Sequence, residues 1–227
     1  MTLSMDVTDE AQVKAATATG LERFGRIDVL VNNAGFGLLG AIEECSAEEV
    51  GSVYRTNVFG LLNVTRAVLP SMRQHRSGHI INFSSIGGYR SAPGWGIYSS
   101  TKFAVEGITE ALYGELAPLG IHATVVEPGY FRTNFLDSSS LRQSAAQIPD
   151  YAGTVGKTRN IAAERNHQQL GDPTKLAPAI LQIVNTDEPP LRSRLGTDTL
   201  QAIAEKNAYV EQETVKWQTL SESTNYK

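Results

Sequence analysis

The sequence lacks several features that would point to specialised classes of protein. Its 227 residues contain one cysteine, Cys45, which excludes an intrachain disulfide framework and a thiolate metal cluster. No apolar run has membrane-spanning length, and the first residues lack the basic and apolar regions of a signal peptide. The net charge of −4 provides no basic stripe for a phosphate backbone. We therefore expect a cytoplasmic protein with no membrane span and no nucleic-acid partner.

Two further absences concern binding sites. The histidines show no metal-ligand spacing with carboxylates or with the cysteine, so no metal site is predicted; they are His75, His79, His122 and His167. No glycine-rich phosphate-binding turn precedes the first predicted strand. The later segment Gly35-Phe36-Gly37-Leu38-Leu39-Gly40 has the G-x-G-x-x-G letters, but its third glycine opens no predicted helix. We interpret it as a chance match on a loop.

Short apolar runs alternate with helical patterns along the chain, which is typical of βαβ units and a buried parallel sheet. With 41% apolar and 19% charged residues, the chain has the length and composition of one soluble domain, residues 1–227. The expected strands cover residues 3–7, 29–32, 79–83, 122–127 and 191–195. The pattern predicts an α/β fold with a doubly wound, largely parallel sheet.

Helix signals separate these strands. Thr8 is the expected cap of a helix that Gly25 ends, and Ser46-Ala47-Glu48-Glu49 is a capping box for a helix running to about Pro70. A third helix is predicted over residues 98–119, followed by Gly120 as its stop.

The third helix carries the residues with the clearest chemistry. Tyr98 and Lys102 are four residues apart, so their side chains lie on one helix face, where an ammonium lowers the pKa of a phenol. A phenol of lowered pKa is a usable general acid or base. Ser85 follows a strand, at the sheet edge where parallel folds place their functional groups, and its hydroxyl is suited to hold a substrate oxygen.

Further motifs accompany these three residues in a characteristic order. Asn32-Asn33-Ala34-Gly35 follows one strand, Asn57 lies in the next helix, and Pro128-Gly129-Tyr130-Phe131-Arg132-Thr133 follows a later strand. In order and spacing, these motifs resemble the short-chain dehydrogenase/reductase family from about residue 3 to the C-terminus. The tail 189–198 is similar to the branch that contains 17β-hydroxysteroid-dehydrogenase-like members. The resemblance implies a Rossmann-type fold and an NAD(P)-dependent oxidoreductase that interconverts a carbonyl and an alcohol by hydride transfer.

The resemblance also implies a role for each matching residue. Tyr98 would be the acid/base, Ser85 would orient the substrate oxygen, and Lys102 would bind the nicotinamide ribose. Asn57 would hold a proton-relay water. The cofactor-binding positions, from the adenine pocket to the nicotinamide, would be Asp6, Val7, Asn33, Ala34, Gly35, Tyr98, Lys102, Pro128, Gly129, Phe131 and Thr133. The implied cofactor is NAD(P)(H), with NADP(H) favoured by family habit, and the implied assembly is a homodimer or homotetramer.

The chain departs from the family pattern at its start. Family members open with a strand, a glycine-rich turn, a helix and a second strand, whereas this chain begins where the third strand should be. We therefore expect the first two strands and the first helix to be missing from the middle of the sheet. Three alternatives remain open: an oxidoreductase recorded from a late start codon or as a fragment, a truncated non-catalytic remnant acting as a binding protein, and an epimerase or dehydratase.

The substrate is predicted only in outline. The segment 135–170 is expected to cover the substrate, and it is polar with scattered apolar residues. A set of aromatic residues favours a hydrophobic ketone or alcohol; its members are Phe36, Trp95, Tyr130, Phe131 and Phe135.

Overall fold

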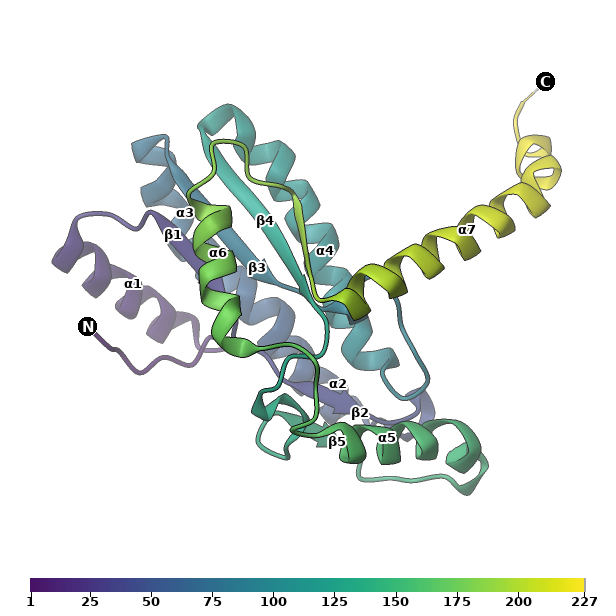
Figure 1. The fold of residues 1–227 in the computed structure, drawn as a ribbon. Coiled ribbons are helices and arrows are strands. Elements are labelled where there is room, and N and C mark those ends of the chain that lie inside the picture. The colour runs from purple at the N-terminus through teal and green to yellow at the C-terminus, as the bar shows by residue number, and fades with distance from the viewer. Residues whose placement is uncertain (227) are drawn as a thin grey trace.

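The computed structural model describes residues 1–226 as an α/β domain built on a four-stranded parallel sheet (Figure 1). The strands stand in the order β1-β3-β4-β6 and are β1 (Val29–Asn32), β3 (Gly78–Phe83), β4 (Ile121–Pro128) and β6 (Arg192–Leu195). Each of these agrees with a predicted strand to within about one residue. A separate parallel pair joins β2 (Gly37–Leu39) to β5 (Leu141–Gln143), which the sequence did not predict.

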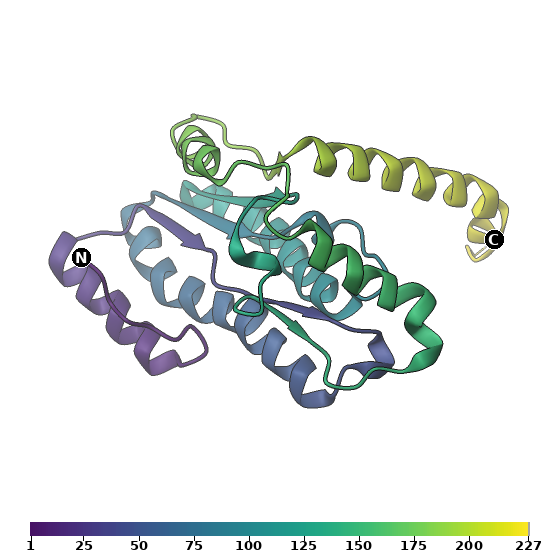
Figure 2. The same cartoon turned by 60° about the horizontal axis from the view of Figure 1, so that its bottom comes forward.

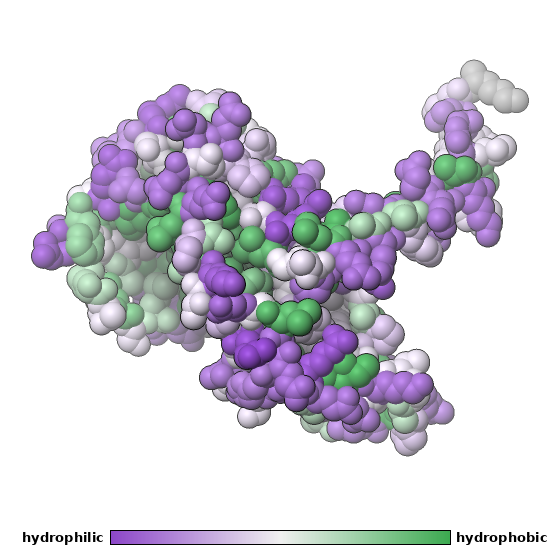
Figure 3. All heavy atoms as spheres, in the orientation of Figure 1, coloured by the Kyte–Doolittle hydropathy of each residue, from purple (hydrophilic) through white to green (hydrophobic). Residues whose placement is uncertain are grey.

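Helices cover both faces of the sheet, and the last helix extends away from it. The α-helices are α1 (Glu10–Phe24), α2 (Ala47–Tyr54), α3 (Leu61–His75), α4 (Gly96–Leu116), α5 (Lys157–Arg165), α6 (Leu176–Val184) and α7 (Thr197–Ser223). Figures 1 and 2 show α3 and α4 on one side of the sheet and α6 on the other. Only the start of α7 packs on the body, and its remainder projects as an arm, which the space-filling view also shows (Figure 3). Within residues 1–226 no helix combines the length and the apolar character needed to cross a membrane.

The main apolar core lies between α1, α3, α4 and the strands. Val13 of α1, Met72 of α3 and Ile80 of β3 are fully buried there. Parallel strands covered by helices are apolar along their whole length, which is why β3 and β4 are readable as continuous runs.

The predicted strand at residues 3–7 is wrong, because residues 3–6 have no regular secondary structure, Val7 lies in a turn, and the segment joins no sheet. Leu3 and Met5 are exposed, whereas Val7 packs on the core and its carbonyl accepts a hydrogen bond of 3.1 Å from Asn63 Nδ2. A strand needs a neighbour to hydrogen-bond with, and among residues 1–226 no strand lies beyond β1. β1 is consequently an edge strand, and Val31 on it is 45% exposed.

Two helix predictions need correction. Asp9, not Thr8, caps α1, since its carboxylate accepts from the backbone N–H groups of Ala11 and Gln12. The helix predicted over 46–70 begins at its capping box, but a π-helical turn, Arg55–Gly60, interrupts it before α3 continues to His75.

The segment Gly35–Gly40 matches G-x-G-x-x-G in sequence but does not form a phosphate-binding turn, in agreement with its interpretation as a chance match. Its third glycine opens no α-helix, because a 3-10 turn and the Ser46 cap precede α2, and residues 37–39 form strand β2.

Candidate active site

The carboxyl ends of all four parallel strands open onto one cavity of about 890 Å³. Asn33 follows β1, Ser84 and Ser85 follow β3, Gly129 follows β4, and Asp198 follows β6. This is the edge where an open parallel sheet presents its functional groups. The cavity volume lies in the range of small-molecule and cofactor sites.

The structure brings Ser85, Tyr98 and Lys102 together at this cavity. Ser85 caps a short 3-10 turn, Ile86–Gly88, by accepting a hydrogen bond of 3.1 Å from Gly87 N–H. Gly87 lies close to both Ser85 and Tyr98, because a Cβ at Gly87 would be 3.6 Å from Ser85 Oγ and 3.4 Å from Tyr98 Cε1. The turn after β3 and the first turns of α4 thus present a hydroxyl, a phenol and an amine to one cavity.

Tyr98 is held by two aromatic neighbours. Its ring lies 5.7 Å from the Trp95 ring and 5.6 Å from the Phe135 ring, in edge-on and tilted geometries. Burial raises the pKa of Tyr98 above its usual range, and hydrogen bonding with Ser85 opposes that rise. Sequence reasoning predicted that Lys102 lowers this pKa, and that direction is wrong here because burial is the largest influence on the phenol.

Lys102 is buried with its amine directed at the end of β3. Its Nζ donates a hydrogen bond of 2.8 Å to the Phe83 carbonyl and lies 5.8 Å from the centre of the Tyr98 ring. Burial lowers the pKa of Lys102 to about 8, and the charge of Glu106 opposes this decrease. The amine is therefore poised to gain or lose its proton near neutral pH.

Asn57 lies behind the cavity wall, not in its lining. Its Oδ1 accepts from Phe36 N–H at 3.1 Å, and its Nδ2 donates to the Phe36 carbonyl and to Thr101 Oγ1, both at 3.0 Å. Both amide hydrogens are thus used to clamp the loop after β1 onto α4. The π-helical turn carries Asn57 into this position.

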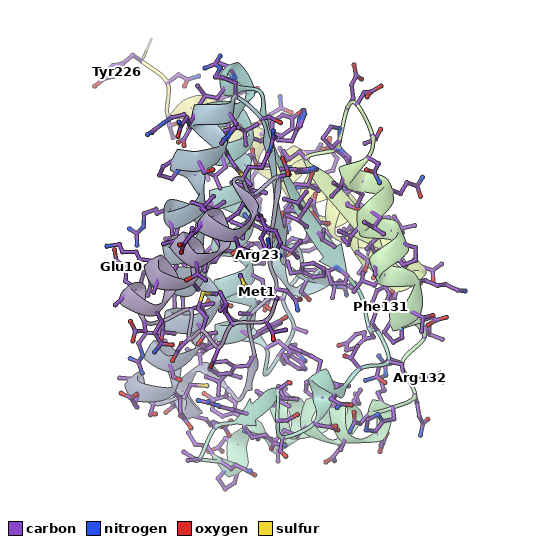
Figure 4. All side chains as sticks on the ribbon, turned by 90° about the vertical axis from the view of Figure 1, so that its left-hand side faces the viewer. Met1, Glu10, Arg23, Phe131, Arg132 and Tyr226 are labelled. Atoms are coloured by element: carbon purple, nitrogen blue, oxygen red, sulfur yellow. The ribbon has the colours of Figure 1, made fainter. Side chains whose placement is uncertain are left out.

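The predicted cofactor residues fall into two groups. Most of them line the cavity: Asn33, Gly35, Tyr98, Lys102, Pro128, Gly129, Phe131 and Thr133. Figure 4 shows Phe131 and Arg132 on the α6 side of the molecule, across from Glu10 of α1. Ala34, Asp6 and Val7 do not line the cavity. Asp6 instead accepts from Thr8 N–H at 2.8 Å and so shapes the approach to α1.

Glycine keeps the cavity open at two places. A Cβ at Gly35 would lie 3.0 Å from Asn57 Oδ1 and 3.7 Å from Lys102 Nζ, so the absence of a side chain leaves room beside the amine. A Cβ at Gly129 would overlap the Asp198 carboxylate, which accepts a hydrogen bond of 2.8 Å from Tyr130 N–H. These are the close approaches that only glycine permits.

The aromatic wall is largely as predicted. Trp95, Tyr130, Phe131 and Phe135 line the cavity, whereas Phe36 does not and instead lies under the Arg142 guanidinium, 4.2 Å away. Segment 135–170 forms one side of the cavity through Phe135, Leu136, Ser140, Arg165 and Gln169.

Sequence reasoning missed several lining residues, above all Asp198, Arg165 and Gln169. Gln169 is 4% exposed, and neither atom of its amide group has a hydrogen-bond partner among the described residues. These positions belong to segments without a local motif, and only the glycine pair at 129 and 196 beside Asp198 offered a signal.

Comparisons with known proteins identify the family of the chain. The model of the family described as short chain dehydrogenase matches residues 1–144. A 3-ketodihydrosphingosine reductase of Bacteroides thetaiotaomicron is 43% identical over 86% of this chain and 72% of its own length.

Two solved structures extend the similarity over nearly the whole chain. A short-chain dehydrogenase from Streptomyces avermitilis has a TM-score of 0.90 at 40% identity, covering 98% of this chain and 81% of its own. A Burkholderia phymatum short-chain dehydrogenase/reductase in complex with NAD has a TM-score of 0.81 at 26% identity, covering 96% and 76%. The chain therefore belongs to the short-chain dehydrogenase/reductase family.

Proposed function

We propose that this protein is an NAD(P)-dependent oxidoreductase that interconverts a carbonyl and an alcohol, with Tyr98 as its acid/base. The observation that carries the proposal is the meeting of Ser85, Tyr98 and Lys102 at one cavity. The alternative of an epimerase or dehydratase has no observation in its favour.

The described residues fit one half of the cofactor. Gly35 leaves space beside the Lys102 amine, and Asn33, Gly129 and Thr133 line the same cavity. These residues would hold the nicotinamide and its ribose. The predicted adenine-side residues, Asp6 and Val7, lie outside the cavity lining, so they add nothing to the fit. When bound, nicotinamide exchanges a hydride with the substrate carbon.

The side chains then supply position and protonation. Ser85 Oγ holds the substrate oxygen beside the Tyr98 phenol, which gives that oxygen a proton on reduction and takes one on oxidation. The Lys102 ammonium stabilises the phenolate that forms when Tyr98 gives up its proton. Asn57 fixes the loop after β1 to α4, which keeps Gly35 beside Lys102.

The substrate class that we propose is an apolar ketone or alcohol. Trp95, Tyr130, Phe135 and Leu176 give the cavity apolar walls close to Tyr98. The Bacteroides relative is named a 3-ketodihydrosphingosine reductase, and a ketone as its named substrate supports this class.

Nucleotide binding is the direct test. The chain has two tryptophans, of which Trp95 lines the cavity and Trp217 lies 55% exposed on the α7 arm. A Trp217→Phe variant therefore makes Trp95 the reporter in titrations with NADPH and NADH, followed alongside thermal unfolding. We expect quenching of Trp95 and a higher melting temperature with one or both nucleotides.

Turnover is tested next with long-chain and short-chain ketones. Tyr98→Phe should bind the nucleotide as the wild type does and lose reduction, because only the phenolic hydroxyl is removed. A cooperatively unfolding protein that binds neither nucleotide would contradict the proposal and favour a non-catalytic binding protein.

A further inference from the structure

The face of α4 that carries Tyr98 and Lys102 carries a third ionisable residue one helical turn further along. Tyr98, Lys102 and Glu106 are spaced by four residues, so they share one face of the helix. All three are buried, with exposed fractions of 6%, 6% and 7%. A phenol, an ammonium and a carboxylate therefore follow one another along the buried side of one helix.

Glu106 lies in a charge cluster behind the cavity, in which the two glutamates are buried and the two arginines are partly exposed. Arg192 Nε is 3.4 Å from Glu106 and 3.6 Å from Glu127, and Arg194 Nε is 3.4 Å from Glu127. In the part of the chain that the structure describes, the oxygens of Glu106 and Glu127 have no hydrogen-bond partner. Burial raises the pKa of Glu106 to about 7, the charge of Glu127 adds to the rise, and Arg192 opposes it.

The surroundings of the cluster bring Glu106 close to the active-site loop. A Cβ at Gly88 would lie 3.1 Å from the Lys102 carbonyl and 3.2 Å from Glu106 Cγ, so the Ile86–Gly88 turn packs tightly on this part of α4. Ser84, next to Ser85, directs its hydroxyl to the Lys102 carbonyl at 3.4 Å. Such packing excludes water, and charge interactions are stronger where water is excluded.

We propose that Glu106 is a positioning residue that keeps the buried Lys102 side chain as an ammonium beside Tyr98. Within this group of charges the Lys102 ammonium and the Glu106 and Glu127 carboxylates are the buried ones, whereas the Glu110 side chain is 61% exposed and its charge is screened. Removal of the Glu106 charge leaves an excess positive charge. Because guanidinium groups keep their protons, the buried amine is the group that deprotonates.

Other ionisable groups face the pair from neighbouring elements. Those sharing a hollow of about 460 Å³ with Glu106 are Tyr89, Arg192, Lys206 and Glu211. Those lining the cavity with Lys102 are Arg90, Tyr98, Tyr130, Arg165, Asp198 and Glu205. In both sets the formal charges are mixed in sign. Tyr98 is buried as Glu106 is, but the charged groups of both sets are at least partly exposed, so Glu106, one helical turn from Lys102, differs from them as a carboxylate buried with the amine.

The test is a titration of Lys102 itself, which needs no turnover. With lysine labelled by ¹³C at Cε, the seven lysines of the chain give separate NMR signals, and Lys102→Arg identifies the signal of Lys102. We expect a midpoint near 8 in the wild type. Glu106→Gln should lower it by on the order of one pH unit, and Glu106→Asp should restore part of the difference.

Glu110→Gln is the matched control. Glu110 is one turn further along α4 and also binds Arg192, but its side chain is 61% exposed, so its charge is screened. The Lys102 midpoint should stay at the wild-type value in this variant. An unchanged midpoint in folded Glu106→Gln would overturn the inference.

A second measurement covers the case in which Glu106→Gln fails to fold. In the wild type, ¹³C labels on glutamate Cδ give the midpoint of Glu106, and the Lys102 signal should show a smaller inflection at the same pH. Absence of that inflection would overturn the inference without any variant.

The catalytic consequence rests on the proposed function. If Lys102 responds to Glu106 but no nucleotide binds, the proposed function fails and the charge role stands. If nucleotide binds and the titration midpoint of Lys102 does not depend on Glu106, this inference fails and the proposed function stands. Where both hold, the alkaline limb of the turnover profile should move to lower pH in Glu106→Gln.

Discussion

One buried carboxylate ties the segment that covers the cavity to the body of the protein. Glu44 ends the 3-10 turn Ile42–Glu44 and is 2% exposed. Its oxygens accept from Ala41 N–H at 2.7 Å, Ile148 N–H at 2.8 Å and Arg159 Nη2 at 2.5 Å. Because Ile148 and Arg159 belong to segment 135–170, Glu44 is expected to act as its anchor.

Glu44→Gln should loosen this segment without unfolding the sheet. The change removes the charge that Arg159 faces, and the Arg159 side chain is 11% exposed. Breaking a buried ion pair from one side costs about 3–5 kcal/mol. The lower figure applies here because Arg159 keeps a hydrogen bond of 3.1 Å to Ser144 Oγ. About 3 kcal/mol corresponds to a roughly hundredfold larger population of the opened segment.

Hydrogen exchange read by mass spectrometry is the assay, with peptides covering residues 145–165 compared with peptides from β3. Glu43→Gln provides the matched control, since Glu43 contacts the same segment through Tyr151 Oη at 2.6 Å but lies at the surface. We expect faster exchange over 145–165 in Glu44→Gln alone. Equal exchange in the two variants would refute the view that burial gives Glu44 its importance.

The anchor should also weaken in acid. Burial alone would raise the pKa of Glu44, but hydrogen bonds from Ile148, Ala41 and Arg159 hold it below the usual 4.5. A carboxyl whose pKa is lower in the folded state stabilises the fold above its unfolded pKa and loses that contribution as pH falls through the folded value. The difference in exchange between wild type and Glu44→Gln should therefore shrink below about pH 4.5.

Two further predictions concern packing and pH. Gly88→Ala should lower the melting temperature and abolish turnover because its Cβ would overlap Ser84 Oγ, whereas Gly107→Ala, with nothing within 4 Å, should be neutral or stabilising in thermal unfolding. Burial and a neighbouring imidazole lower the pKa of His79 from 6.5 to about 4, so stability should fall by about 3 kcal/mol as pH drops from 6.5 to 4. In urea unfolding His79→Gln should lose most of that dependence, and His75→Gln, at an exposed helix end, should retain it.

The strands that could be predicted from sequence are those whose apolar character is continuous. β3 and β4 are buried along nearly their whole length, so a continuous run of apolar residues is enough to recognise each strand in the sequence. The segment 3–7 alternates apolar and polar residues as a half-buried strand does, but it has no neighbour to pair with, and an alternating pattern does not reveal whether a ladder partner exists. The π-helical turn also could not be predicted from the sequence, because the hydrogen bonds of Asn57 within it are made to residues far away in the chain.

The candidate site divides in the same way. Ser85, Tyr98 and Lys102 lie next to strand ends or at helical spacing, so local patterns were enough to bring them together. Asp198 and Gln169 reach the cavity through tertiary packing of separate segments, and no local spacing marks them. The pKa of Tyr98 was predicted in the wrong direction, since the sequence shows the nearby ammonium but not the extent of burial.

Hydrogen bonds between buried polar side chains fix the register of β1 against β3, and so bring the ends of these two strands to the same edge of the cavity. Asn32 is paired with Asn82 in the β1–β3 register, and its Nδ2 donates to Asn82 Oδ1 at 2.9 Å. Asn82 in turn donates to Thr109 of α4 at 3.0 Å. A slip of β1 by two residues would keep the same faces buried but separate Asn32 Nδ2 from Asn82 Oδ1, at about 1–3 kcal/mol for each buried group left without a partner. The apolar residues of β1 and β3 tolerate such a slip, so the asparagine pair selects the register that places Asn33 and Ser85 at one edge.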